Sequence, residues 1–250
     1  MNTSKSMLDL LKGYHSGCTQ SESAEKQRLP QPPLERSRGG KTIRLSRDFV
    51  AAARCSNVME LLNGRRSVRR YASAPLSLIE LSFLLWYTQG TEKVVGNQRK
   101  AAIRTVPSAG ARHPFECYLA LLNVEGLEPG LYHYLSLSHE LEFVKSVDNL
   151  GDRLTEVSSG QSFLSLAAAV FIWAAVPERT IWRYPDQAEK YILLDAGHVC
   201  QNLYLASGII GCGACAIGAY DQDLADALIG VDGQEELTVY MAAVGKKEEE

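Results

Sequence analysis

The most concentrated group of chemically useful side chains is a run of four arginines within six residues, Arg65-Arg66-Ser67-Val68-Arg69-Arg70. Arginine presents a planar fork of N–H donors that matches phosphate oxygens, Ser67 adds a hydroxyl donor, and Gly64 lets the backbone approach a ligand. The run therefore indicates a phosphate site. A solvated basic turn is the alternative that the charge cluster by itself leaves open.

Two segments rich in glycine and alanine follow farther along the chain. The first, 107–114, places small residues between two prolines, which predicts a rigid loop whose amides can face a planar ligand. The second, 208–219, allows close approach to a flat ring or, equally, tight core packing. For the first segment the alternative is an ordinary loop.

The elements that must position these segments follow from capping and hydrophobic patterns. Asn57 with Glu60, and Ser77 with Glu80, are capping boxes that begin helices. Helices are predicted at 57–62, 77–89, 149–158, 186–208 and 224–229, and strands at 115–124, 131–134, 140–144, 167–176, 214–217 and 237–244. Residues 91–107 are polar and are expected to form a loop. Helices and strands interleave, which favours an α+β fold with a mainly antiparallel sheet.

Length and composition limit the possible functions. The chain has 250 residues, 46% hydrophobic and 22% charged, with a net charge of −3. A chain with no overall positive charge is not expected to bind nucleic acid. No apolar run approaches the roughly 18 residues of a membrane span, so we expect no membrane partner. The stretch 7–11 is too short and too charged for a secretory signal, which favours a cytoplasmic protein.

Six cysteines are scattered through apolar stretches, which is typical of reduced, buried thiols; they are Cys18, Cys55, Cys117, Cys200, Cys212 and Cys215. Cys212 and Cys215 form a C-x-x-C pair, but they lie among glycine and alanine and no second pair completes a zinc site. We expect no metal. The segment 16–48 is expected to be an extended arm or linker, with a helix docking at 7–11. The predicted domains are an extension at 1–54, a folded unit at 55–247 and an acidic tail at 248–250.

Four segments, taken in order, resemble the nitroreductase superfamily of FMN-dependent oxidoreductases. They are RRSVRRY, PSAGARHPFE, EKYILLDAGHVCQNLYLASG and GCGACAIGAYD. More narrowly, they look like its SagB/McbC-type branch, the azoline dehydrogenases of thiazole and oxazole peptide biosynthesis. The resemblance covers roughly 57–245. It implies a nitroreductase-like α+β fold, with a central antiparallel sheet surrounded by helices, and a homodimer with flavin at the interface.

The resemblance also implies roles for particular residues. Those that would hold the FMN phosphate and ribityl chain are Arg65, Ser67 and Arg69, with Arg66 as a secondary candidate. Those that would pass along the isoalloxazine, usually from the partner subunit, are Pro107, Ser108, Ala109 and Gly110. Those that would approach the flavin N5 edge are Ala216, Ile217 and Gly218. Lys246 or Lys247 could supply the basic residue that the superfamily often places after the last strand.

The resemblance implies that Lys190 and Tyr191 are catalytic. A lysine desolvated near a flavin could remove the Cα proton of an azoline, with the tyrosine orienting it or relaying the proton. A solvated lysine and a packed tyrosine are the alternative. For His113 both a structural and a substrate-lining role stay open. Asp195 and His198 are expected to hydrogen-bond to each other on one helix, as structural residues.

Two activities fit these residues. One is dehydrogenation of a thiazoline or oxazoline in a peptide, with oxygen taking the electrons. The other is reduction of a nitro or quinone compound by NAD(P)H. A different class of protein is a further alternative: a flavin-binding protein that catalyses no reaction, or one that consumes its flavin as a substrate.

Overall fold

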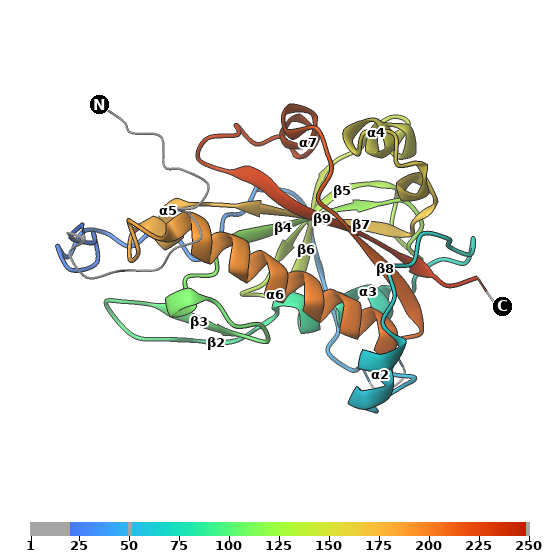
Figure 1. Ribbon diagram of the computed structural model, residues 1–250, viewed down its shortest axis with the longest axis horizontal. Helices are drawn as coiled ribbons and strands as arrows, with labels where there is room; N and C mark the ends of the chain where they lie inside the picture. The colour runs from blue at the N-terminus through green and yellow to red at the C-terminus, as the bar shows by residue number, and fades with distance from the viewer. Residues whose placement is uncertain (1–20, 50–51, 249–250) are drawn as a thin grey trace.

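The computed structural model describes residues 21–49 and 52–248. Within them lies a seven-stranded sheet in which every neighbouring pair of strands is antiparallel (Figure 1). The strand order is β1-β6-β5-β4-β7-β9-β8. The strands are β1 Thr42–Arg44, β4 Phe115–Leu121, β5 Gly130–Leu135, β6 Glu140–Lys145, β7 Ala169–Ala175, β8 Cys212–Ile217 and β9 Leu237–Lys246.

The central strands β4 and β7 are buried along their whole length. A strand covered on both faces has no solvent side, so its sequence is a nearly continuous apolar run instead of an alternating one. For such a run, as at 167–176, periodicity alone cannot separate a strand from a helix. The predicted strand there is confirmed as β7, which pairs with β4 and β9.

Helices cover both faces of the sheet. On one face, α3 (Leu78–Gln89) and α6 (Ala188–Ile209) pack on a core that includes Leu119 and Phe171. On the other, α4 (Leu150–Val157) and α7 (Gln222–Ile229) pack on Tyr118 and Ile172 (Figure 1). Consecutive residues of a strand point to opposite faces, which divides the core into two. The predicted α+β architecture is confirmed.

The short helices complete the list of elements: α2 Val58–Gly64, η1 Ala109–Ala111, η2 Ser162–Leu166 and α5 Glu178–Ile181. The Asn57 side chain caps α2 by accepting from the amides of Met59 and Glu60. The capping box of Ser77 and Glu80 is present at the start of α3. Both predicted helix starts are confirmed. Among the described residues no helix combines the length and apolar character that a membrane crossing requires.

The loop predicted at 91–107 is partly wrong. Residues 91–104 contain a separate two-stranded sheet, β2 (Thr91–Val95) with β3 (Ala101–Arg104). Most of the β2 side chains are exposed. The hairpin therefore lacks the alternation of apolar and polar residues by which a strand is recognised.

Within the segment 16–48, expected to be an extended arm or linker, residues 42–44 join the sheet. Strand β1 pairs with β6, through Ile43 opposite Leu141, and adds an edge to the sheet. Polar residues predominate in this segment, and such a composition is typical of a linker. Here, however, Arg36, Ser37 and Arg38 donate hydrogen bonds to carboxylates that are buried in the sheet. The helix expected at 7–11 and the end of the acidic tail lie outside the described residues.

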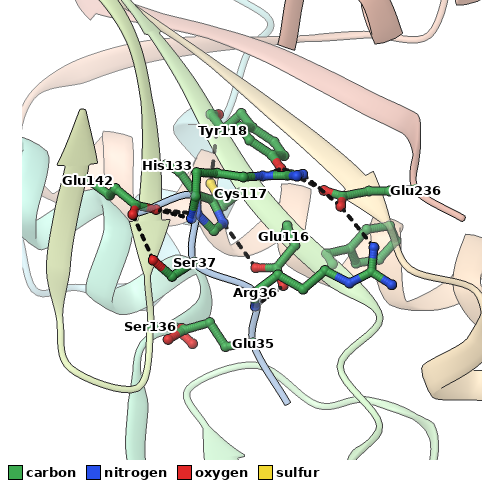
Figure 2. A network of polar contacts seen from close by, with 12 residues as sticks. Glu35, Arg36, Ser37, Glu116, Cys117, Tyr118, His133, Ser136, Glu142 and Glu236 are labelled. Atoms are coloured by element: carbon green, nitrogen blue, oxygen red, sulfur yellow. Dashed lines mark hydrogen bonds and ion pairs between the residues drawn. The ribbon is translucent and has the colours of Figure 1, made fainter. Parts of the chain in front are cut away.

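A buried network of charges holds this segment in place, as Figure 2 shows. His133 lies between two glutamates, with Nε2 3.0 Å from Glu116 Oε2 and Nδ1 3.3 Å from Glu142 Oε2. The backbone amides of Arg36 and Arg38 donate to the same two carboxylates, each at 2.8 Å. His133, a residue of the predicted hairpin that sequence analysis did not select, is thus the centre of this network.

Electrostatics favour the charged form of every member of this triad. Burial alone would lower the pKa of His133, but the carboxylates of Glu116 and Glu142 outweigh it and raise that pKa. Burial alone would raise the pKa of Glu116, but Arg179 and His133 lower it to about 2. The pKa of Glu142 is also lowered, because hydrogen bonds from the N-terminal segment and His133 outweigh burial. The network is therefore an ion-paired one.

Candidate functional site

The arginine run lies along the free edge of the seven-stranded sheet. The amide of Val68 donates to the carbonyl of Ala214 at 2.9 Å, and Ser67 forms a parallel bridge with Ala214 in the edge strand β8. A Cβ added at Gly213 would lie 2.6 Å from Val68 Cβ. This glycine therefore lets the extended arginine segment approach β8. Farther along the segment, the guanidinium of Arg69 lies over the Phe163 ring of η2, 6.0 Å from its centroid.

A cavity of about 190 Å³ opens beside this segment. Its lining includes Arg65 and Arg66 from the arginine run, Lys247 after β9, and Tyr204 from α6. Three cationic side chains and the nearby Ser67 hydroxyl form a donor set that suits a phosphate group. An added Cβ at Gly64 would meet nothing within 4 Å, so the backbone there is open to a ligand.

The structure separates the two lysines proposed for the C-terminal end of the site. Lys246 is the last residue of β9, and its ammonium pairs with the carboxylate of Glu80 on α3. Lys247, one residue later, lines the cavity. Of the two, Lys247 is the one beside the arginines.

Tyr204 connects the arginine run to β8. Its hydroxyl lies 3.0 Å from Ser67 Oγ and accepts from the amide of Ala216 at 2.9 Å. The guanidinium of Arg65 lies over its ring, 5.2 Å from the centroid. Sequence reasoning did not select Tyr204. The sequence feature that could have identified it is a tyrosine, which has a polar tip, near the end of a helix that is apolar on most of its circumference.

Residues 216–218, predicted to approach the flavin N5 edge, lie at the end of β8. They continue the sheet edge along which the arginine run lies. Ala216 is half-buried and its amide is engaged by Tyr204, whereas Ile217 is buried and pairs with Met241. Gly218 follows the strand and is exposed. These residues are thus brought together with the arginine run.

The loop at 107–110 forms a second group, on the first half of α6. Ser108 Oγ donates to Asp195 Oδ2 at 2.5 Å, and the amide of Ala109 donates to Asp195 Oδ1 at 3.2 Å. Gly110 has a φ of 57°, a conformation that favours glycine. Pro107 is exposed, so the loop presents itself to solvent.

Asp195 therefore accepts hydrogen bonds from the 107–110 loop, whereas we expected its partner to be His198. Burial raises the pKa of Asp195, although the bonds from Ser108 and Ala109 oppose the shift. His198 is exposed on the same helix. Helical spacing indicated that the two residues were neighbours, but it could not reveal that a loop from elsewhere in the chain competes for the carboxylate.

Lys190 and Tyr191 lie at the same end of α6 as this loop. The rings of Tyr191 and Tyr184 meet edge to face with centroids 4.9 Å apart. An added Cβ at Gly110 would lie 2.6 Å from Tyr184 Oη, so Tyr184 joins the loop to Tyr191. Lys190 and Tyr191 are both half-buried.

The two groups lie at different places along α6. Asp195 marks the loop group and Tyr204 marks the arginine group, nine residues apart, which at about 1.5 Å per residue is about 14 Å along the helix axis. Figure 1 shows α2 beside the last turns of α6, where a Cβ added at Gly208 would lie 3.0 Å from Leu61 of α2. Within one chain the predicted site residues thus form two half-sites.

The surroundings of His113 and of the Cys212–Cys215 pair indicate structural roles. His113 is buried, its Nε2 lies 3.0 Å from the carbonyl oxygen of Ala102, and burial lowers its pKa to about 3. A neutral histidine that satisfies a backbone group is a structural residue. Burial likewise raises the pKa of Cys212 to about 11 and raises that of Cys215, so both stay thiols. In the described ranges no group of three or more His, Cys, Asp or Glu side chains is arranged so that it could hold a metal ion.

Comparison with known proteins gives the class. The nitroreductase family profile matches residues 62–246. MJ1384 of Methanocaldococcus jannaschii, named as a nitroreductase, is 38% identical over 171 residues, which are 68% of this chain and 82% of that protein. The microcin B17-processing protein McbC of Escherichia coli is 31% identical over 113 residues, 43% of this chain and only 41% of McbC. The chain belongs to the nitroreductase family.

Solved structures agree with this assignment. A nitroreductase structure from Ralstonia eutropha superposes with a TM-score of 0.67 at 24% identity, covering 89% of this chain and 96% of that chain. A nitroreductase of Exiguobacterium sibiricum in complex with FMN gives a TM-score of 0.55 at 16% identity, covering 78% of this chain and 90% of that one. The nitroreductase fold is therefore confirmed.

Proposed function

We propose that this protein is an FMN-dependent oxidoreductase of the azoline dehydrogenase type. The observation that carries the proposal is the cationic cavity at the β8 edge, with Arg65, Arg66, Lys247 and the Ser67 hydroxyl around it. This donor set suits a phosphate monoester at the end of a flat cofactor. When bound, FMN supplies a two-electron acceptor and donor.

The residues present fit the parts of FMN. Arg65, Ser67 and Lys247 would hold the phosphate, with Arg66 as a second cation. Arg69 would act farther along the segment, where its guanidinium lies over the Phe163 ring. Ile217 and Gly218 lie at the end of β8, next to the exposed turn, where a backbone amide can meet the ring edge. Lys246 is less suited, because Glu80 already pairs with it.

The site is completed by a second copy of the chain in this proposal. Helix α6 exposes Leu193 and Leu194, with 61% and 51% of their surface accessible, in its first half. A Cβ at Gly197, at the midpoint of α6, would meet nothing within 4 Å, so another helix can come close there. Two α6 helices that cross antiparallel at this point place the 107–110 loop of each chain toward the arginine run of the other. A two-fold symmetric dimer generates both sites at once.

The reaction that we propose is oxidation of a thiazoline or oxazoline ring in a peptide to the aromatic azole. Lys190 would take the Cα proton of the ring, and FMN, when bound, would supply the acceptor for the two electrons and the second hydrogen, with oxygen as the final oxidant. Tyr191 orients Lys190 or relays its proton. Both residues lie on the loop half-site, which the dimer brings to the partner's flavin. The similarity to McbC supports this substrate class.

NAD(P)H-driven reduction of a nitro or quinone compound is the second candidate. It is favoured by the similarity to MJ1384, which is longer and closer than the similarity to McbC. It uses the same cofactor and the same two half-sites, with a nicotinamide as hydride donor in place of the azoline.

The proposal is tested on the purified full chain. We expect a yellow protein whose flavin is bleached anaerobically by a thiazoline-containing peptide and recovers with oxygen. Arg65→Ala should retain at most about a tenth of the flavin, because it loses a charge-assisted contact to phosphate, whereas the exposed Arg70→Ala control should retain it. A protein that takes up no FMN contradicts the proposal. Flavin reduced by NAD(P)H and not by the thiazoline peptide selects the second candidate.

A further inference from the structure

Tyr204 lies between the two parts of the proposed phosphate end of the site and belongs to neither. It projects from α6, whereas Ser67 lies on the arginine run and Ala216 on β8. Its hydroxyl touches both, at 3.0 Å and 2.9 Å. In addition, the guanidinium of Arg65 lies over the ring of Tyr204, as a cation–π contact.

The groups set the direction of one of these hydrogen bonds, whereas either hydroxyl can donate in the other. The amide of Ala216 can only donate, so the Tyr204 oxygen accepts. The hydrogen of the Tyr204 hydroxyl is then available for Ser67 Oγ, which can accept it. With that direction the hydrogen of Ser67 itself is left over, on an exposed side chain that directly follows Arg65 and Arg66 in the chain.

We propose that Tyr204 is a positioning residue that turns the Ser67 hydroxyl into a fixed donor for a phosphate monoester. The chain of donors runs from the Ala216 amide through Tyr204 to Ser67 and ends on a phosphate oxygen. A phosphate dianion accepts hydrogen bonds only, so its presence fixes the polarity of the whole chain. Bonds aligned in this way strengthen one another. The inference rests on the proposed function, because it takes the ligand to be the phosphate of FMN.

A consequence concerns the amide of Ala216. The resemblance assigned it to the N5 edge of the flavin, together with Ile217 and Gly218. In the structure this amide already has Tyr204 as its acceptor. The inference therefore moves Ala216 from the ring end to the phosphate end of the site.

The test compares ligands with and without a phosphate. For Tyr204→Phe we expect the dissociation constant of FMN to rise about tenfold, the loss of one hydrogen bond to a charged group, and that of riboflavin to change less than about twofold on the same scale. Both are measured by fluorescence titration of the apoprotein. Tyr220→Phe is the matched control, since it removes a phenol that bonds the Thr238 carbonyl on another part of the fold. Thermal unfolding establishes that each variant is folded.

A second variant separates orientation from packing. In a Ser67→Ala background, Tyr204→Phe should weaken FMN binding by no more than about twofold, because the donor that it orients is gone. Equal losses for FMN and riboflavin, or a full loss of FMN affinity in the Ser67→Ala background, overturn the inference.

Inorganic phosphate, followed by phosphorus NMR, separates failure of this inference from failure of the proposed cofactor. A wild-type protein that binds phosphate but not FMN contradicts the cofactor, and the same comparison with Tyr204→Phe then decides the inference: weaker phosphate binding supports it and unchanged binding overturns it. A wild-type protein that binds neither ligand contradicts both.

Discussion

At the scale of single residues, the proposed chemistry depends most on Lys190. The proton at Cα must leave as the electrons go to the flavin, and a positioned general base contributes about 10²–10⁴ in rate. Lys190→Ala should therefore lower the turnover of a thiazoline peptide by about this factor while the flavin content stays the same. Stopped-flow measurement of anaerobic flavin reduction separates this step from reoxidation.

Lys145→Ala provides the matched control, because Lys145 is an exposed lysine on β6. It should leave flavin reduction unchanged. If Lys190→Ala reduces its flavin as fast as the wild type, Lys190 is not the base. If Lys190→Ala loses its flavin, the residue belongs to the binding site instead.

At the scale of elements, the function depends on α6. One helix carries Asp195 and Lys190 for one half-site and Tyr204 for the other, and its exposed middle is the surface that we propose to pair with a second copy. A glutamate in this apolar contact would be buried without a partner in both chains. Leu194→Glu should raise the dimer dissociation constant by about a hundredfold or more.

Light scattering during size-exclusion chromatography measures the mass, and the visible spectrum of the eluted peak measures the flavin. Loss of the dimer and loss of the flavin should occur together, because the half-sites come from different chains. Leu224→Glu, on α7 across the sheet, is the control and should leave both unchanged. A Leu194→Glu monomer that keeps its flavin would contradict a shared site.

At the scale of the whole molecule, the buried network around His133 joins the N-terminal segment to the sheet. The raised pKa of His133 gives stability that is complete below about pH 6.5 and is lost as the pH rises through the folded-state pKa. The lowered pKa of Glu142 gives stability that is complete above about pH 4.5 and is lost as the pH falls through the folded-state value. Stability should thus be greatest between these limits.

His133→Gln removes the central charge and leaves two buried carboxylates with fewer partners. We expect the free energy of unfolding to fall by about 3–5 kcal/mol near pH 6, the cost of breaking a buried ion pair. The loss of stability above pH 6.5 should disappear in this variant. Urea unfolding across pH 4–9 measures both effects. His198→Gln, at an exposed position, should retain the wild-type profile; an unchanged profile in His133→Gln would contradict the ion-paired network.

The sequence by itself determined the local features of this protein. The following features depend on residues close together in the chain: the cap at Asn57, the capping box at Ser77, the central strand β7, the long α6 and the donors of the arginine run. Such features follow from patterns over one or two turns or one strand. The family resemblance followed from the same short segments.

The tertiary structure decided every contact between distant segments. It assigned Asp195 to Ser108, paired Lys246 with Glu80, brought Tyr204 between Ser67 and Ala216, and attached residues 35–44 to the sheet through His133 and its glutamates. A polar side chain has many possible partners, and which one it meets depends on how the elements pack, not on its neighbours in the chain. For this reason the sequence identified the donors of the proposed phosphate site, and only the fold showed which residue holds them in place.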